Sequence, residues 1–290
     1  MKTLTFLAVV AFAPLISLAQ QSKPILVTPR WLKDNFNDPS LVLLQVTYLK
    51  LDYDREHIEG AHYLWPESLA PNSPEGSYNA PDVAKATALL QSYGVNDNSH
   101  IILYHIRNEV SPTARMFLTL ENLGLKGRVS FLNGGIEAWK KENFPVTNAV
   151  TQPAKGSIKL KQGDLLVNKE YVLNTLSSDK GFIVDARMKN YYDGDPTGNP
   201  RDGHITGAKN IPYTEMLDAT NKFKSVDELR GYFGPVASPD RELVTYCFIG
   251  QTASVVYMAG RLLGYDMKLY DGSMQEWSRI ESLPMEKTAK

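Results

Sequence analysis

Short apolar runs alternate along this chain with longer segments in which apolar residues recur every three or four positions. The short runs are rich in Val, Ile, Leu and aromatic residues, a pattern that predicts buried β-strands. They lie at 41–46, 101–104, 129–132, 182–185, 243–246 and 268–270. The longer segments predict helices at 81–93, 113–123, 167–176 and 253–263. Strands that alternate with helices predict an α/β fold with mainly parallel sheets flanked by helices.

Three blocks in the first half of the chain recur about 140 residues later. The pairs are HIEGAHY (57–63) with HITGAKN (204–210), ILYH (102–105) with VTYC (244–247), and LNGGIEAW (132–139) with YDGSMQEW (270–277). Such a repeat indicates one ancestral unit used twice. The length of 290 residues also suits two domains rather than one. We therefore predict similar domains at 22–147 and 164–290, joined by a polar linker at 148–163.

The first 19 residues have the features of a secretory signal peptide. Lys2 precedes an apolar run that ends at Ser17-Leu18-Ala19. The run is short for a membrane span, and its small-residue ending favours cleavage after Ala19. We therefore expect an exported protein, periplasmic or secreted, that has no membrane contact once residues 1–19 are removed.

The composition is that of a globular protein with one unpaired thiol. Hydrophobic residues make up 43% and charged residues 22%, and the formal net charge is −1. No global field therefore favours nucleic acid as a partner. The five histidines are not grouped with other ligands, so we expect no metal site. The only cysteine, Cys247, cannot form an internal disulfide, so it is either an inert core residue or a reactive thiol.

The surroundings of Cys247 favour the reactive interpretation. Cys247 follows a predicted strand and precedes a predicted helix that begins near Thr252 or Ala253. The intervening residues 248–251 allow only a tight loop, in which Gly250 can adopt angles that other residues avoid. Backbone N–H groups converge at such a helix start and stabilise negative charge, which suits a thiolate or a persulfide. The alternative is a small core residue at the end of a strand.

The order of the blocks in the second half resembles the rhodanese family. Asp185-Ala-Arg187 is followed by Gly-His-Ile-Thr-Gly-Ala, then by the cysteine loop, and then by Tyr-Asp-Gly-Ser with Glu-Trp. The tandem form of this family includes thiosulfate and 3-mercaptopyruvate sulfurtransferases. The resemblance implies that Cys247 accepts sulfur and that the loop after it binds the donor. The loop residues are Phe248, Ile249, Gly250, Gln251 and Thr252, with no arginine or glycine directly after the cysteine.

The resemblance also implies roles for four residues outside the loop. Arg187 is expected to face the loop and an anionic donor, which a forked guanidinium suits, and Asp185 to tie adjacent loops together. The alternative for Arg187 is a surface ion pair. Arg201 is the nearest further cation in sequence and is a candidate for donor binding. His204 is interpreted as a structural histidine.

The first domain lacks the groups that the reaction needs. Gln45-Val-Thr47 replaces Asp-x-Arg, and His105 replaces the cysteine. We therefore expect this domain to pack against the second and to form a wall of the site, since ligand sites favour domain interfaces.

These observations predict a sulfurtransferase that uses no cofactor. Its donor is a small anion, with thiosulfate preferred and 3-mercaptopyruvate as the alternative, and its acceptor is cyanide or a thiol. A second interpretation, from a different class, is a non-catalytic rhodanese-like module that carries sulfur or binds a partner.

Overall fold

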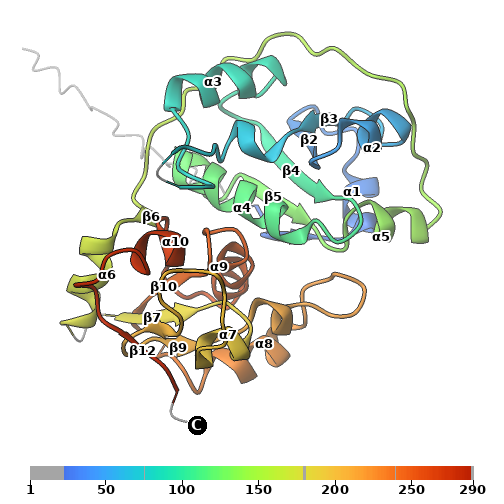
Figure 1. Ribbon diagram of the computed structural model, residues 1–290. Coiled ribbons are helices and arrows are strands. Elements are labelled where there is room, and N and C mark those ends of the chain that lie inside the picture. The colour runs from blue at the N-terminus through green and yellow to red at the C-terminus, as the bar shows by residue number, and fades with distance from the viewer. Residues whose placement is uncertain (1–22, 75, 179–180, 239, 289–290) are drawn as a thin grey trace, which may run out of the picture.

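Two parallel five-stranded sheets, one in each half of the chain, form the framework of the protein (Figure 1). The computed structural model describes residues 23–74, 76–178, 181–238 and 240–288. The predicted signal peptide, residues 1–19, lies outside these ranges. Among the described residues, no helix is long and apolar enough to cross a membrane.

The first sheet has the strand order β1-β5-β4-β2-β3, and all of its pairs are parallel. Its strands are β1 (Leu26–Val27), β2 (Leu41–Val46), β3 (His62–Leu64), β4 (His100–His105) and β5 (Val129–Leu132). The helices around it are α1 (Pro29–Asp34), α2 (Lys50–Arg55), α3 (Val83–Ser92), α4 (Val110–Leu120) and α5 (Gly135–Lys141), with shorter turns η1 (Pro66–Ser68) and η2 (Glu121–Leu125).

The second sheet repeats this arrangement in the order β6-β11-β10-β7-β9. Its strands are β6 (Leu166–Val167), β7 (Gly181–Asp185), β9 (Lys209–Asn210), β10 (Glu242–Tyr246) and β11 (Met267–Tyr270), and β8 (His204–Ile205) pairs separately with β12 (Met285–Glu286). The helices are α6 (Lys169–Leu176), α7 (Lys189–Asp193), η3 (Tyr213–Met216), α8 (Val226–Phe233), α9 (Ala253–Leu262) and α10 (Ser273–Trp277). The equal strand order confirms the predicted duplication.

The predicted long elements are present, whereas the edge strands were missed. All six predicted strands and all four predicted helices occur, with ends shifted by a few residues. The strands β1, β6 and β9 have two residues each. A segment of two residues is too short to show alternating apolar and polar positions. Its pairing depends on the neighbouring strand.

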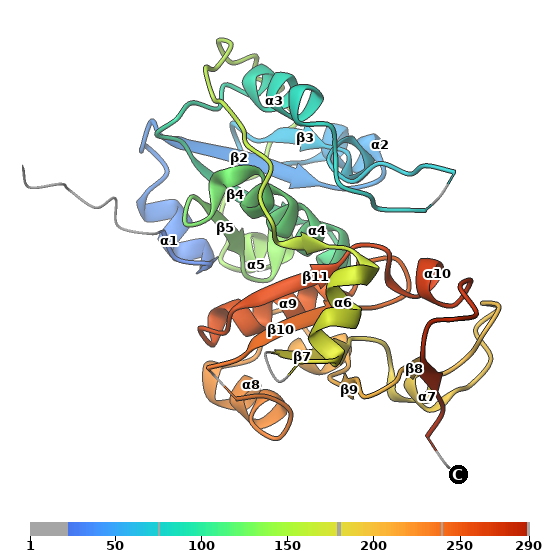
Figure 2. The same cartoon turned by 90° about the vertical axis from the view of Figure 1, so that its left-hand side faces the viewer.

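The two domains meet through the helices α4 and α9, which lie side by side (Figure 2). Ala253 to Gly260 of α9 are all buried, as is nearly all of α4. A helix that is covered on every side needs apolar or small residues around its whole circumference. One apolar cluster, which includes Phe117 of α4 and Val256 of α9, therefore runs continuously from one domain into the other.

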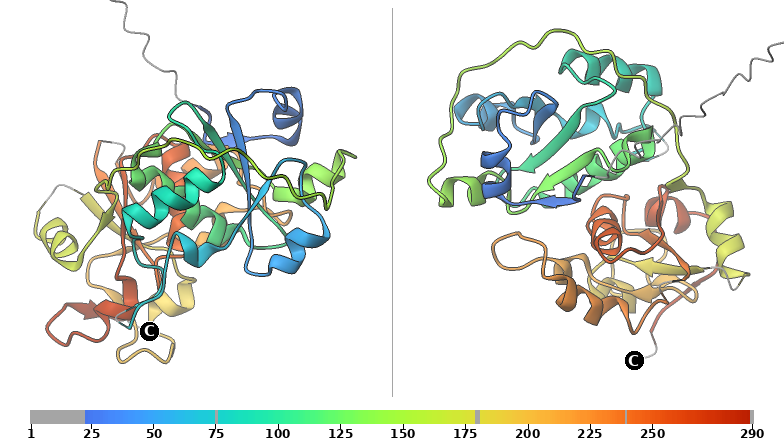
Figure 3. Two further views of the ribbon diagram at one scale, coloured as in Figure 1. Left: turned by 90° about the horizontal axis from the view of Figure 1, so that it is seen from above. Right: turned by 180° about the vertical axis from the view of Figure 1, so that it is seen from behind.

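The predicted linker is an extended strap along the first domain. Residues 148–163 contain no helix or strand and run around the outside of that domain (Figure 3). Gly156 and Ile158 donate backbone hydrogen bonds of 2.8 and 3.1 Å to Gln91 and Val95, and the Ile158 side chain is fully buried. The predicted domain limits themselves stay predictions.

Candidate active site around Cys247

Cys247 lies directly after β10, at the carboxyl end of the second sheet, and is 1% exposed. Its Sγ accepts a hydrogen bond of 3.2 Å from the backbone N–H of Gly250. Gly250 has φ of +79°, a left-handed conformation that favours glycine. The helix α9 begins at Ala253, three residues after Gly250, so the cysteine loop leads directly into a helix N-terminus. Both features stabilise negative charge on sulfur.

Backbone hydrogen bonds from the start of α10 fix the cysteine loop. Met274 and Gln275 donate backbone N–H groups to the carbonyls of Cys247 and Phe248 at 3.0 and 2.9 Å. The Ser273 hydroxyl accepts the N–H of Cys247 at 3.3 Å and itself donates to the carbonyl of Tyr270. Ser273 was not singled out from the sequence, although it lies in the repeated YDGS block, and that block was the signal that would have found it.

Arg187 is buried beside the loop in an ion pair with Asp185. Its Nε and Nη2 donate to the Asp185 carboxylate, with Nη2 at 2.6 Å from Oδ2, and Nη2 also donates to the carbonyl of Gly203. The side chains of both ion-pair partners are at most 1% exposed. The alternative of a surface ion pair is therefore wrong. Nη1 of Arg187 is buried and has no hydrogen-bond partner in the described part of the chain.

The charge of Arg187 is held in place by its neighbours. Burial acts to lower the pKa of Arg187, but the hydrogen bonds and charge of Asp185 outweigh it and raise that pKa, with Tyr246 and Cys247 acting in the same direction. The guanidinium carbon lies 5.1 Å from the centroid of the Phe248 ring. Arg187 therefore lies against the cysteine loop with one N–H-bearing nitrogen unused.

The remaining loop residues are partly exposed, and one of them contacts the first domain. Phe248, Ile249, Gln251 and Thr252 are each of intermediate exposure. Gln251 Nε2 lies 2.8 Å from the phenol oxygen of Tyr48 and 2.7 Å from that of Tyr78. Burial raises the pKa of Tyr48 to about 12, so this phenol stays protonated at neutral pH.

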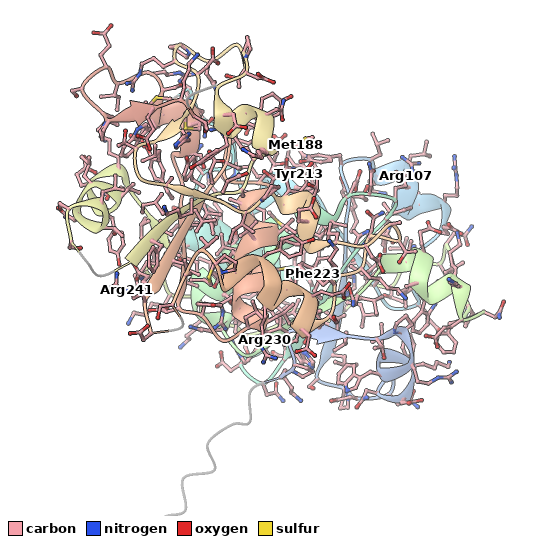
Figure 4. All side chains as sticks on the ribbon, turned by 90° about the horizontal axis from the view of Figure 1, so that it is seen from below. Arg107, Met188, Tyr213, Phe223, Arg230 and Arg241 are labelled. Atoms are coloured by element: carbon pink, nitrogen blue, oxygen red, sulfur yellow. The ribbon has the colours of Figure 1, made fainter. Side chains whose placement is uncertain are left out.

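Met188, in the loop after β7, and Tyr213, at the start of η3, lie on the face seen in Figure 4. Tyr213 donates its backbone N–H to the carbonyl of Ala186 at 2.9 Å, which places η3 next to Arg187. Met188 is 46% exposed. An apolar side chain next to the buried arginine is therefore open to solvent.

Asp185 and His204, for which structural roles are expected, are buried and form hydrogen bonds within the second domain. The Asp185 backbone carbonyl accepts an N–H from the Asn210 side chain at 2.9 Å and the backbone N–H of Ile211 at 3.0 Å, so these bonds join the end of β7 to the end of β9. His204 is 3% exposed, stacks on Tyr192 at 3.7 Å between ring centroids, and contacts the Tyr192 carbonyl through Nδ1 at 2.7 Å.

In the part of the chain that the structure describes, the Arg201 guanidinium forms no hydrogen bond with the cysteine loop. Its nitrogens donate to backbone carbonyls at the end of α10 and just after it, with the accepting residues Trp277, Ser278, Ile280, Glu281 and Leu283. Unsatisfied carbonyls at a helix C-terminus are natural partners for a cation. The prediction that Arg201 binds the donor stays a prediction, with this geometry against it.

The rhodanese-like domain family matches residues 28–142 and 168–280. The chain belongs to this family. The sulfur carrier protein TtuD of Thermus thermophilus is 30% identical over 91% of this chain and 96% of its own length. The thiosulfate sulfurtransferase of Azotobacter vinelandii is 27% identical over 91% and 98%. The solved rhodanese fold of the 3-mercaptopyruvate sulfurtransferase SseA from Escherichia coli has a TM-score of 0.75 and 26% identity, covering 87% and 99% of the two chains.

The first rhodanese-like domain preserves the framework of the site without its nucleophile. Tyr104 accepts the N–H of Ile58 at 3.1 Å, as Tyr246 accepts that of Ile205 in the second domain. His105, in the place of Cys247, is 1% exposed, and burial lowers its pKa to about 4. A neutral buried imidazole therefore fills this position.

A cavity of about 660 Å³ lies near the loop without reaching the sulfur. Residues from both rhodanese-like domains and the strap line it, among them Asn79, Gln162, Lys268, Asp271 and Gln275, and Cys247 is not in its wall.

Proposed function

We propose that this protein is a sulfurtransferase that passes sulfur from thiosulfate through a persulfide on Cys247. The Cys247 thiolate attacks the outer sulfur of the donor. A new S–S bond forms to Cys247, the S–S bond of thiosulfate breaks, and sulfite leaves with its electron pair. Cyanide or a thiolate then attacks the terminal sulfur, and the Cys247 thiolate leaves with the electron pair of its S–S bond. Each step is a nucleophilic displacement at sulfur, so no outside oxidant is needed. The kinetics are ping-pong, because the first product leaves before the acceptor reacts.

The observation that carries this proposal is the N–H of Gly250 on Cys247 Sγ, at the carboxyl end of β10 and next to the start of α9. Open α/β sheets bind ligands at this edge. The same N–H and helix terminus that stabilise a thiolate also suit the anionic persulfide that follows it. Membership of a family that contains sulfurtransferases supports the same conclusion.

The distribution of arginines supports thiosulfate over 3-mercaptopyruvate as the donor. The planar carboxylate and ketone of mercaptopyruvate are best bound by paired guanidinium forks. Arg187 has one free nitrogen, whereas Arg201 is occupied by backbone carbonyls. A compact anion needs only convergent N–H groups and one guanidinium. Relatives with either named activity match this chain at the same identity of 27%.

The decisive experiment is a comparison of wild-type protein with Cys247→Ser. Thiosulfate should add the mass of one sulfur atom to the wild type, and cyanide should remove it. The serine variant should fold, gain no sulfur and form no thiocyanate, because a hydroxyl cannot make a persulfide. Normal turnover by this variant would disprove the mechanism. The ratio of kcat/KM for thiosulfate and mercaptopyruvate, with one acceptor, tests the donor, and a clear preference for mercaptopyruvate would reject thiosulfate.

A sulfur carrier without turnover is the second candidate, because Cys247 is only 1% exposed and a relative at 30% identity is named a sulfur carrier. Such a protein would gain one sulfur and keep it in the presence of cyanide or small thiols. Repeated turnover with either small acceptor would exclude this candidate.

We also propose that the protein acts after export, in a periplasmic or secreted location. The support is the signal-like segment at residues 1–19. Expression of the full chain in a secreting bacterium should yield a mature protein that begins at Gln20. An intact Met1 in the protein recovered from the cytoplasm, with none outside it, would reject export.

A further inference from the structure

Gln251, in the cysteine loop, contacts two tyrosines of the first domain. Its side-chain amide nitrogen lies 2.8 Å from the phenol oxygen of Tyr48 and 2.7 Å from that of Tyr78. Tyr48 follows β2 and is 36% exposed, whereas Tyr78 is 6% exposed. The three side chains therefore form one polar cluster, which we call the phenol–amide cluster, that extends from solvent to buried groups between the domains.

The phenol–amide cluster has more hydrogen-bond donors than its own contacts use. An amide carries two N–H groups and each phenol carries one O–H group, so the cluster has four polar hydrogens. The two contacts of Gln251 use two of these hydrogens, whichever way the amide faces. Burial raises the pKa of Tyr48 to about 12, so this phenol keeps its proton at neutral pH. In the described part of the chain, no residue accepts the two remaining hydrogens, which are free to bind a ligand.

The phenol–amide cluster lies next to the turn that binds Cys247 Sγ. Gln251 directly follows Gly250, whose N–H donates to Sγ at 3.2 Å. Arg115 of α4 donates to the carbonyl of Tyr78 and, at 3.4 Å, to the carbonyl of Gly250. Tyr78 has φ of +61°, which costs energy in a residue with a side chain and persists only where surrounding contacts fix it. The cluster therefore has a constrained position beside the cysteine loop.

Uncharged donors at this position suit the oxygen-bearing end of an anionic sulfur donor. Thiosulfate carries its oxygens on the sulfur that is not transferred. The side chain directly after Cys247 is Phe248, which adds no charge, and Nη1 of Arg187 is the buried guanidinium nitrogen left without a partner among the described residues. Hydrogen bonds to a charged acceptor are stronger than those between neutral groups. As the S–S bond breaks, charge accumulates on the departing sulfite, and O–H or N–H donors placed there stabilise it.

We propose that the phenol–amide cluster recognises the oxygen-bearing (–SO₃) end of the sulfur donor, with O–H and N–H groups of Tyr48, Tyr78 and Gln251 in place of a second cation. The first domain then binds the part of the donor that is not transferred. This inference rests on the proposed function for its kinetic consequence, but binding of an oxyanion is measurable without sulfur transfer. It predicts a preference for donors that carry oxygen over donors that consist of sulfur alone.

Three substitutions of similar size remove the groups of the cluster one at a time. Tyr48→Phe removes the exposed phenol, Tyr78→Phe removes the buried one, and Gln251→Met removes the amide that orients both. Tyr257→Phe is the matched control. Tyr257 lies on α9, and its phenol donates across the domain interface to Glu121 at 2.6 Å rather than to the cysteine loop. Any effect that comes only from a lost interdomain phenol contact should appear in the control as well.

The first measurement compares sulfur uptake from thiosulfate with uptake from inorganic persulfide, HS–S⁻, which has no oxygen. In both reactions the Cys247 thiolate forms the new S–S bond while the S–S bond of the donor breaks, and sulfite or hydrosulfide leaves with the electron pair. Uptake in one turnover is followed by mass. Each cluster variant should take up sulfur from thiosulfate about tenfold more slowly, the effect of one hydrogen bond to a charged group, and change its uptake from persulfide by less than about threefold. Tyr257→Phe should change neither rate.

The second measurement needs no sulfur transfer. Sulfate carries the same kind of oxygens as thiosulfate, and it should slow alkylation of Cys247 by uncharged iodoacetamide in the wild type. The sulfate concentration for half-maximal protection should rise about tenfold in Tyr48→Phe and stay unchanged in Tyr257→Phe. The alkylation rate without sulfate reports on the cysteine loop itself and should be similar in all of these proteins. A wild type that sulfate does not protect would overturn the proposal.

The comparison of donors decides between recognition and a general effect on the loop. An equal loss with thiosulfate and persulfide in folded Tyr48→Phe would overturn the proposal, and so would wild-type behaviour of this variant in both measurements. If Tyr78→Phe does not fold, Tyr48→Phe decides, since its side chain is partly exposed. A wild type that takes up no sulfur from either donor, while protection by sulfate still depends on Tyr48, would reject the proposed function alone and leave the recognition site in place.

Discussion

The guanidinium of Arg187 lies 5.1 Å from the centroid of the Phe248 ring, so the buried cation and the residue after the cysteine are in contact. At the position directly after the cysteine, where a cation would help to bind an anionic donor, this chain has the apolar Phe248. In the structure, the face of that ring meets the cation of Arg187, an attraction worth about 0.5–2 kcal/mol. Phe248 therefore contacts the buried cation of Arg187 and adds no second positive charge to the loop.

Arg187→Lys should slow sulfur uptake from thiosulfate by one to two orders of magnitude and affect attack by the acceptor less. A lysine keeps the charge near Asp185 but offers no second nitrogen to the donor. Arg187→Ala is the less informative variant. It leaves Asp185 buried and unpaired, which costs about 3–5 kcal/mol of stability. Half-reaction rates measured by rapid quench check the expectation, and unchanged uptake in Arg187→Lys would assign Arg187 a purely structural role.

Gly250→Ala should lower sulfur transfer, whereas Gly264→Ala should not. Both glycines have positive φ, +79° and +87°, so alanine strains each by about 1–2 kcal/mol. A Cβ at Gly250 meets Arg115, while one at Gly264 has nothing within 4 Å. Melting temperatures and thiocyanate formation, measured on both variants, separate strain from loop geometry. Equal activity in the two variants would contradict the importance given to the Gly250 turn.

Arg201→Met should destabilise the protein by about 3 kcal/mol and leave kcat/KM for thiosulfate within about threefold of wild type. The variant removes the contacts to carbonyls at the end of α10 and just after it, among them those of Trp277 and Ile280 at 2.8 and 2.6 Å. Arg230→Met is the control, since Arg230 is 65% exposed in a surface ion pair and should contribute less than about 1 kcal/mol. A large fall in kcat/KM with the fold intact would instead place Arg201 at the donor site.

His105 should make the stability depend on pH without affecting sulfur transfer. Burial lowers its pKa to about 4, from an unfolded value of about 6.5, so the unfolded state binds the proton first as the pH falls. The stability is therefore complete above about pH 6.5 and falls by up to about 3 kcal/mol toward pH 4.

His105→Gln should flatten this dependence in urea unfolding, and His100, whose pKa burial also lowers to about 4, remains in both proteins. The difference between the two curves isolates His105. Equal slopes, or a loss of activity in the folded variant, would contradict the assignment.

The order of residues along the chain determined the two α/β units and the place of Cys247. Long strands and helices have periodic apolar patterns because each buries one face or both, and the repeated blocks align His105 with Cys247 and Gly135 with Ser273. The loop after β10 was predictable for the same reason. A cysteine followed by five residues, one of them glycine, before an apolar helix leaves little freedom to the backbone.

Only the tertiary structure decided which distant side chains reach that loop. Arg115 and Tyr78 lie more than a hundred residues before Gly250 in the sequence, and no local pattern distinguishes them from surface residues. Arg201 shows the converse, because proximity in sequence suggested the site, whereas the guanidinium donates to a set of carbonyls at the end of α10 and just after it. The physical reason is the same in both cases. A long charged side chain goes to the unsatisfied partners that packing provides, and packing of α4 against α9 is a property of the whole fold.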